Sequence, residues 1–308
     1  MGIFDFLRKK KHIDTATNKV SQKSTGQEND TDMLSHAIDV LMKHDAPESR
    51  KHVFSVFRRY VEEGKWLFTL GETDEKGTKL YTINERGKEY IPVYTDGRLI
   101  EKGKGTVIQT DVNKYLEVLY STDISGGLVI NPGKQNMYFE KDYIPAFLIH
   151  DKFPKQDNSG SPQKNWGEGI PVYKESDLMT KGQMLNFAMQ VVNDYDLKTS
   201  EFMPISYCDN TNAPCNFIMK KDNDLFFIVV YPYAFPDEPK FDDEKKKTVL
   251  NLCKKFNAKC LFAPVGLGSC DEERAAASLL LKGDGFYANY TGMEEINIDY
   301  THAKSIQF

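Results

Sequence analysis

Apolar residues recur at helical spacing in the first part of the chain, over residues 33–41 and again over 50–63, with Pro47 between them. Short apolar runs, most of them separated by glycine-bearing turns, then predict strands at residues 66–70, 80–83, 89–94 and 106–110. A helix is expected over 112–120 with Asp111 as its N-cap, followed by a central strand over 127–131. Together with a closing run at 141–147, this order predicts an α+β domain over residues 32–150.

The second half of the chain has a more regular pattern, with either Thr180 or Ser176 as the N-cap of its first helix. The predicted elements are a helix that ends at 190–192, strands at 202–208, 216–220 and 225–230, a helix at 242–257, a strand at 260–265, a helix at 272–281 and a last strand near 296–298. The corner Asp222–Asp224 predicts a hairpin. We therefore expect a second mixed α/β domain over 175–308, in the order helix, three strands, helix, strand, helix. The polar residues 151–174 would join the two domains as a linker.

The first eleven residues differ from the rest of the N-terminal region. Four apolar side chains fall on or beside one face of a short helix: Ile3, Phe4, Phe6 and Leu7. Four basic residues, 8–11, follow directly. This pattern predicts docking to a membrane surface or to a partner. The alternative is a frayed, solvated tail, because two turns of helix are marginal in water. Residues 12–31 are polar and predict a flexible linker.

Composition and charge exclude several classes of protein. A chain of 308 residues is long enough for about two domains. The net charge is −5 and the lysines are scattered among acids, so no nucleic acid is expected as a partner. No run approaches the ~20 apolar residues that span a bilayer, and no signal peptide is evident. The sequence therefore predicts a cytoplasmic protein, with weak contact at a membrane surface through residues 1–11.

The five cysteines all lie in the second half of the chain: Cys208, Cys215, Cys253, Cys260 and Cys270. Their odd number and irregular spacing, without a C-x-x-C motif, argue against a zinc site or a disulfide framework. We expect small apolar side chains in a reduced core. No metal and no cofactor is predicted.

Two segments about thirty residues apart carry the most information about the family. Tyr90–Asp96 predicts a strand that runs into a turn, and Gly126–Gly133 predicts a buried strand stopped by Asn-Pro-Gly. With a helix of the expected length between them, these segments resemble the "ipvyTD" and "gliiNPg" motifs of the SseB family (enhanced serine sensitivity), over residues 38–150. The resemblance implies an α+β N-terminal domain, often followed by a second domain, and it implies no catalytic residues.

The two turns in these motifs offer the candidate binding residues, Asp96 and Asn131. The Asp96 carboxylate could bind a cation or a partner's arginine, and the corner at Asn131 could let backbone amides approach a ligand. The alternatives are an Asx turn and a simple strand stop. If the turns are neighbours in space, they would form the best candidate surface of this domain.

Enzyme templates match less well. The element order of the second half resembles the restriction-endonuclease fold, whose metal chemistry needs an Asp and a D/E-x-K triplet at strand ends. Asp237 and Glu244–Lys246 match this pattern in residue type but not in position, because the triplet falls in a predicted helix. His150 and His302 cannot be tied to a nucleophile from the sequence. Cys270 follows a glycine-bearing segment, predicted as a strand-to-helix connection, and is the one thiol near a predicted helix N-terminus.

The sequence thus favours a non-enzymatic protein-interaction module whose partner is another protein. The competing hypothesis is an enzyme with a nuclease-like or thiol-dependent activity in the second domain. An absence of converging polar groups in that domain would favour the first hypothesis, and a closed pocket around Cys270 or paired carboxylates would favour the second.

Overall fold

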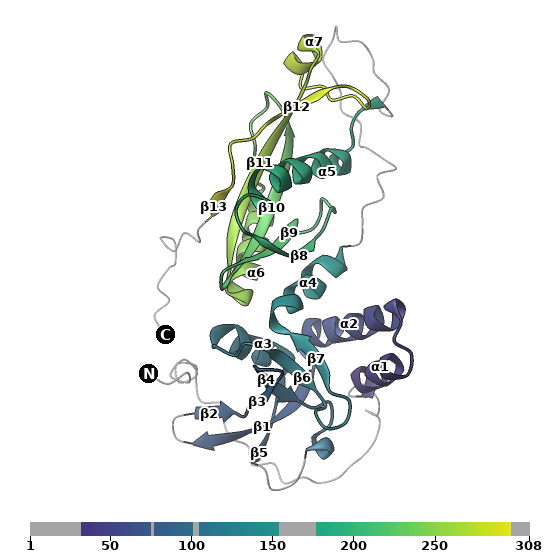
Figure 1. Cartoon of the computed structure of the whole chain (residues 1–308), viewed down its shortest axis with the longest axis vertical. Coiled ribbons are helices and arrows are strands. Elements are labelled where there is room, and N and C mark those ends of the chain that lie inside the picture. The colour runs from purple at the N-terminus through teal and green to yellow at the C-terminus, as the bar shows by residue number, and fades with distance from the viewer. Residues whose placement is uncertain (1–31, 75–76, 101–104, 154–176, 297–308) are drawn as a thin grey trace. The chain divides into compact units, whose positions relative to one another are not determined.

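The computed structural model describes residues 32–74, 77–100, 105–153 and 177–296 (Figure 1). The chain divides into two compact units, residues 1–144 and 145–308, and both contain helices and strands, so the fold is mixed α+β as predicted. The division precedes the predicted domain end at residue 150, and residues 145–153 belong to the second unit. Four predicted docking residues lie outside the described part of the chain: Ile3, Phe4, Phe6 and Leu7. Nearly all of the predicted linker lies outside it as well.

The first unit contains two small sheets and three helices in its described residues. The helices are α1 (Asp32–Lys43), α2 (Pro47–Glu62) and α3 (Val112–Ser121). The strands are β1 (Trp66–Asp74), β2 (Gly77–Leu80), β3 (Ile83–Glu85), β4 (Lys88–Val93), β5 (Thr106–Asp111), β6 (Gly127–Ile130) and β7 (Met137–Glu140). The strand order is β2-β1-β5 in one sheet and β3-β4-β6-β7 in the other. Only the β4–β6 pair is parallel among these strands, and α3 lies in the connection between its two strands.

Local sequence signals explain where these helices begin. Helix α2 begins at Pro47, three residues before the start of the predicted helix. Proline is tolerated there because the N–H groups of the first turn have no intrahelical acceptor, so the missing N–H of proline breaks no hydrogen bond. Asp111 is the N-cap of α3 as predicted, and its carboxylate accepts from the backbone of Asn113 and Lys114. The apolar sides of α2 and β7 meet in the core, where the rings of Phe57 and Phe139 stack at 4.3 Å.

Strand β6 is buried along its whole length between β4 and β7. Gly127 has a φ of 130°, and a Cβ there would lie 2.1 Å from the Phe139 carbonyl oxygen. Only glycine allows the backbones of β6 and β7 to approach so closely.

The second unit is built around one six-stranded sheet. Its helices are α5 (Lys181–Val192), α6 (Asp243–Phe256) and α7 (Glu272–Ala276), with α4 (Ile144–Ile149) at its start. Its strands are β8 (Met203–Tyr207), β9 (Phe217–Lys221), β10 (Asp224–Ala234), β11 (Ala258–Ser269), β12 (Phe286–Asn289) and β13 (Glu294–Ile296). The sheet order is β12-β11-β10-β9-β8, and β13 also pairs with β11. The predicted order of helix, three strands, helix, strand and helix is confirmed from α5 to α7.

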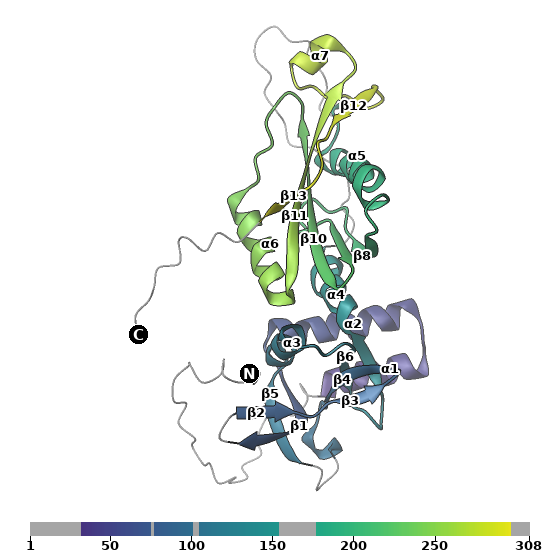
Figure 2. The same ribbon diagram turned by 60° about the vertical axis from the view of Figure 1, so that its left-hand side comes forward.

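Helices α5 and α6 cover opposite faces of this sheet, as Figure 2 shows. The central strands β10 and β11 are parallel, and α6 connects them. Ile228 and Val230 belong to the core cluster that includes α5, whereas Phe227 on the other face contacts Phe256 of α6. Burial on both faces explains why residues 225–230 form an unbroken apolar run.

Two strands of the second unit are longer than their sequence pattern predicts. Strand β10 continues to Ala234, and β11 continues to Ser269, so the segment at Gly266 is a strand and the predicted strand-to-helix connection is wrong. Tyrosine rings lie across the glycines of β11. A Cβ on Gly266 would lie 2.9 Å from the Tyr233 hydroxyl oxygen, and one on Gly268 would lie 2.2 Å from the Tyr287 ring.

Candidate functional site

The two predicted turns are neighbours in space, which was the condition for a common surface. Asn131 Oδ1 accepts from the backbone N–H of Thr95 at 2.9 Å, and Asn131 N–H donates to the Val93 carbonyl at 2.8 Å. The prediction of a surface turn is nevertheless wrong for Asn131, because that residue is 0% exposed. Its side chain joins two strand ends inside the first unit.

A buried network of hydrogen bonds uses the rest of the Asn131 amide. Asn131 Nδ2 donates to Gln135 Oε1 at 2.6 Å, and Gln135 Nε2 in turn donates to the Ser35 carbonyl at 2.9 Å. The network thus links the β6 end to helix α1. Because every bond joins elements of the fold, its role is to hold them together.

Asp96 remains partly exposed, but its carboxylate is already engaged. It accepts from Arg98 N–H at 2.8 Å and from Arg98 Nε at 2.7 Å, which is the Asx-type turn given above as the alternative. The hydrogen bonds to Arg98 lower the Asp96 pKa. The pair of turns therefore offers little free polar surface.

The second unit contains a histidine–cysteine contact that sequence reasoning missed. His150 Nδ1 lies 2.8 Å from Ser206 Oγ, and His150 Nε2 lies 3.6 Å from Cys215 Sγ. Burial lowers the His150 pKa to about 4 and raises that of the Cys215 thiol. Since Cys215 is 0% exposed, a neutral imidazole and a neutral thiol pack together where no substrate reaches them. The 65-residue separation left no local signal in the sequence.

The other predicted chemical residues do not assemble into a catalytic site. Four cysteines are buried as expected, but the expectation is wrong for Cys270, which is exposed at the end of β11. Glu244–Lys246 lies in the first turns of α6 rather than at a strand end. Within the described segments, no group of three or more His, Cys, Asp or Glu residues could hold a metal ion.

Among its described residues, the second unit has a cleft of about 1050 Å³ beside the carboxyl end of β10, which we call the β10 cleft. Strand β10 provides five consecutive lining residues, Val230–Ala234. The other lining residues come from the start of α5, the start of α6 and four loops: Leu178, Met179, Lys181, Met184, Leu185, Thr211, Asn212, Asp237, Glu238, Lys240, Phe241, Asp242, Lys245, Ser278 and Leu280. A position beyond the carboxyl end of a parallel strand is a common ligand site in α/β folds.

The two faces of the β10 cleft differ in chemistry. On the α6 face, the ring of Tyr231 lies 6.0 Å from that of Phe262, and Phe241 stacks on Phe262 at 4.4 Å. On the α5 face, the lining residues Met184 and Leu185 are aliphatic. The cleft therefore presents an aromatic wall and an aliphatic wall on either side of one strand edge.

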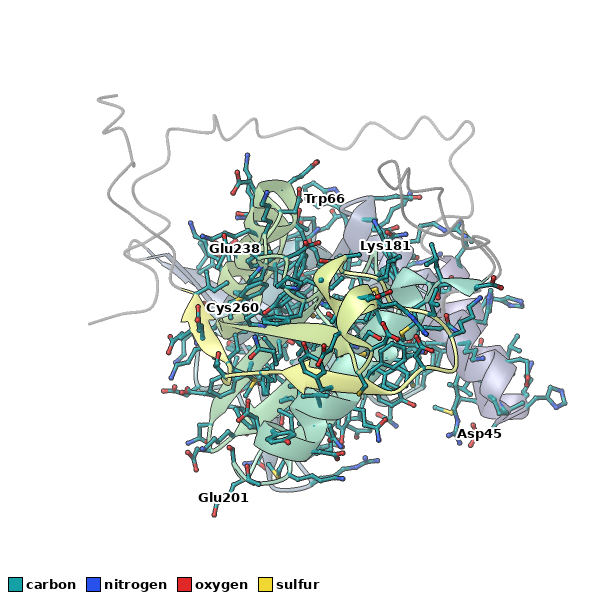
Figure 3. All side chains as sticks on the ribbon, turned by 90° about the horizontal axis from the view of Figure 1, so that it is seen from above. Asp45, Trp66, Lys181, Glu201, Glu238 and Cys260 are labelled. Carbon is teal, nitrogen blue, oxygen red and sulfur yellow. The ribbon has the colours of Figure 1, made fainter. Side chains whose placement is uncertain are left out.

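Charged groups line the cleft, and two of the three acids among them, Asp237 and Asp242, accept hydrogen bonds. Asp242 accepts from the backbone N–H of Lys245 at 2.8 Å and caps α6, while Asp237 accepts from Ser278 Oγ at 2.9 Å. Two further charged lining residues, Lys181 and Glu238, are labelled in Figure 3.

Lys245 is the half-buried cation of the cleft. Its Nζ donates to the Thr211 carbonyl at 3.3 Å, and among the described residues it forms no ion pair. Burial lowers the Lys245 pKa. An ammonium group has three donors, so this side chain keeps the capacity to bind an acceptor in the cleft.

A family model described as a domain of unknown function (DUF8840) matches residues 182–296, which include most of the second unit and most of the cleft lining. No curated protein and no solved structure matches the chain. None of the helices in the described residues is long and apolar enough to cross a membrane.

Proposed function

We propose that this chain is a non-enzymatic binding protein and that the β10 cleft takes a segment of another protein. The observation that supports it is the cleft itself, about 1050 Å³ in volume, with aromatic and aliphatic walls and a half-buried ammonium group. This volume is at the upper limit of the ~300–1,000 Å³ of small-molecule sites, which favours a larger ligand. Among the described residues that line it there is no histidine or cysteine to act as a base or a thiol nucleophile.

The proposal moves the binding surface from the first unit to the second. Asp96 and Asn131 are engaged in bonds within the fold, whereas the walls of the β10 cleft are open. The similarity of residues 38–150 to the SseB family, the cytoplasmic location and weak membrane contact through residues 1–11 remain parts of the proposal. The alternative is a nuclease-like or thiol-dependent enzyme, and no site among the described residues favours either activity.

Affinity capture with matched variants tests this proposal. The intact chain, Tyr233→Ala and Tyr207→Ala would be immobilised and exposed to lysate of the native cell, and captured proteins would be quantified by mass spectrometry. Tyr233 lines the cleft, whereas Tyr207 lies on β8 and is 64% exposed outside it. We expect a protein that the intact chain and Tyr207→Ala retain and that Tyr233→Ala loses. Identical capture by all three chains, with unchanged melting temperatures, would reject the cleft as the binding surface.

A further inference from the structure

One edge of β10 is left without a neighbouring strand inside the cleft. Strand β10 pairs with β11 from Leu225 to Ala234, but with β9 only from Asp224 to Ile228. Asn216 ends the β9 ladder, because its side-chain Oδ1 accepts from Val230 N–H at 3.0 Å. Beyond Val230, β10 therefore has a partner on one side only.

The direction of the backbone groups along this edge follows from strand geometry. Both polar groups of one residue point to the same side of a strand, and successive residues alternate. Phe235 N–H donates to Leu267 of β11, so odd-numbered residues face β11, and Val230 N–H faces away from it. The carbonyls of Val230 and Pro232 and the N–H of Ala234 consequently point to the open side.

These three groups have no hydrogen-bond partner within the part of the chain that the structure describes. The position of Pro232 agrees with this assignment. Proline has no N–H to donate, so within a strand it is tolerated where its nitrogen faces an open edge. The residues Val230–Ala234 all line the β10 cleft. The cleft thus contains two backbone acceptors and one donor in the arrangement of an unfilled sheet position.

The outer edge of the same sheet is protected in a way that this inner edge is not. Strand β8 carries Pro204, and its pairing with β9 has an irregularity between Pro204 and Ser206. Proline and bulges on an edge strand oppose pairing with another chain. The β10 edge instead lies in a cleft whose lining includes the starts of helices α5 and α6, which cover opposite faces of the sheet.

We propose that an extended, carboxylate-bearing peptide segment of a partner protein adds to the β10 edge as a further strand. This inference rests on the binding function proposed above and names the mode of binding at the same cleft. Peptide N–H groups donate to the carbonyls of Val230 and Pro232, and a peptide carbonyl accepts from Ala234 N–H. Five residues of β10 line the cleft, so a segment of about five residues fits the edge.

Side-chain chemistry selects the partner. In an added strand, alternate side chains face the aliphatic wall at Met184 and the aromatic wall at Tyr231. The Lys245 ammonium then donates to a carboxylate of the peptide, because among the described residues it forms no ion pair with the acids that line the cleft, Asp237, Glu238 and Asp242. The carboxylate comes from an acidic side chain or from the peptide C-terminus.

Displayed peptides provide the probe for this mode of binding. Two phage libraries of random dodecapeptides, one with free C-termini and one with internal inserts, would be selected on the full chain. Peptides that bind the intact chain and Tyr207→Ala but not Tyr233→Ala would be synthesised with a single N-methyl group at each position in turn. We expect about tenfold weaker binding at alternate positions and less than about twofold at the positions between them, because only alternate N–H groups bond to the edge.

A uniform response to N-methylation along a cleft-bound peptide would overturn strand addition while leaving the binding function intact. If neither library nor the lysate yields a ligand that Tyr233→Ala loses, the proposed function itself fails, and the inference with it. For the carboxylate, each peptide would be amidated at its C-terminus or changed from Asp or Glu to the amide. One of these changes should weaken binding to the intact chain about tenfold and leave binding to Lys245→Met unchanged. If neither change weakens binding to the intact chain, the proposed role of Lys245 is overturned.

Discussion

The stability of the second unit should depend on pH through His150. This ring is 4% exposed, and burial lowers its pKa from 6.5 to about 4. Below pH 6.5 the unfolded chain binds a proton at this ring that the folded chain does not bind. The free energy of unfolding must therefore fall as the pH falls from 6.5 toward 4, and then level off.

The size of the effect follows from the same two pKa values. One pKa unit corresponds to about 1.4 kcal/mol, so the full loss is about 3 kcal/mol. Relative to about pH 7.5, the loss is about 1 kcal/mol at pH 5.5 and about 2.5 kcal/mol at pH 4.5. Asp45, Asp96 and Asp194 also have lowered pKa values, but these carboxyls titrate below their ordinary value of 3.8 and thus below this window.

Cysteine labelling during urea denaturation measures this loss in the second unit alone. Four thiols are buried there, and the exposed Cys270 serves as an internal reference that reacts in the native state. A pyridyl disulfide labels thiols at acid pH. His150→Gln, which cannot gain a proton, is the matched control. If the intact chain and His150→Gln lose stability in parallel between about pH 7.5 and 4.5, the reasoning about the buried neutral ring is refuted.

Three further predictions concern stability and can be checked by urea denaturation followed by circular dichroism. Asn131→Ala leaves a buried backbone N–H without its acceptor and should cost about 2–3 kcal/mol; a cost below ~0.5 kcal/mol would contradict the network. Gly127→Ala should cost more than about 3 kcal/mol, whereas Gly133→Ala, also at positive φ but with open space around its Cβ, should cost about 1 kcal/mol. Equal losses would argue against the close approach of the strands. Gly268→Ala should cost about 2 kcal/mol through the Tyr287 ring, and the cost should largely vanish in a Tyr287→Ala background; an unchanged cost would show that the ring is not the obstacle.

Most helices and the order of the elements were predictable because their signals are local. Asp111 caps α3 as predicted, and Thr180, one of the two candidates for the cap of α5, forms a reciprocal pair with Gln183. The corner at Asp222–Asp224 joins β9 and β10 as an antiparallel hairpin. Each of these features depends on residues within a few positions of one another.

Strands without a local signal were missed. β7 and β12 have four residues each, too few to establish an alternation of apolar and polar positions, and the strand predicted at 80–83 falls across the junction between β2 and β3. The end of β10 was missed for a different reason. The strand was predicted to end at Val230, and Pro232 is tolerated beyond that point because no strand pairs with β10 on the open side, which is a property of the sheet.

The sequence by itself determined a mixed α+β chain, most of its helix caps and its main strands, because short-range spacing and side-chain chemistry control these features. Only the tertiary structure decided that Asn131 is buried, that His150 meets Cys215 and that one edge of β10 is open beside Lys245. These features join residues distant along the chain, or depend on where a neighbouring strand stops. The candidate binding site is of this kind, since a strand edge is free only when the whole sheet leaves it so.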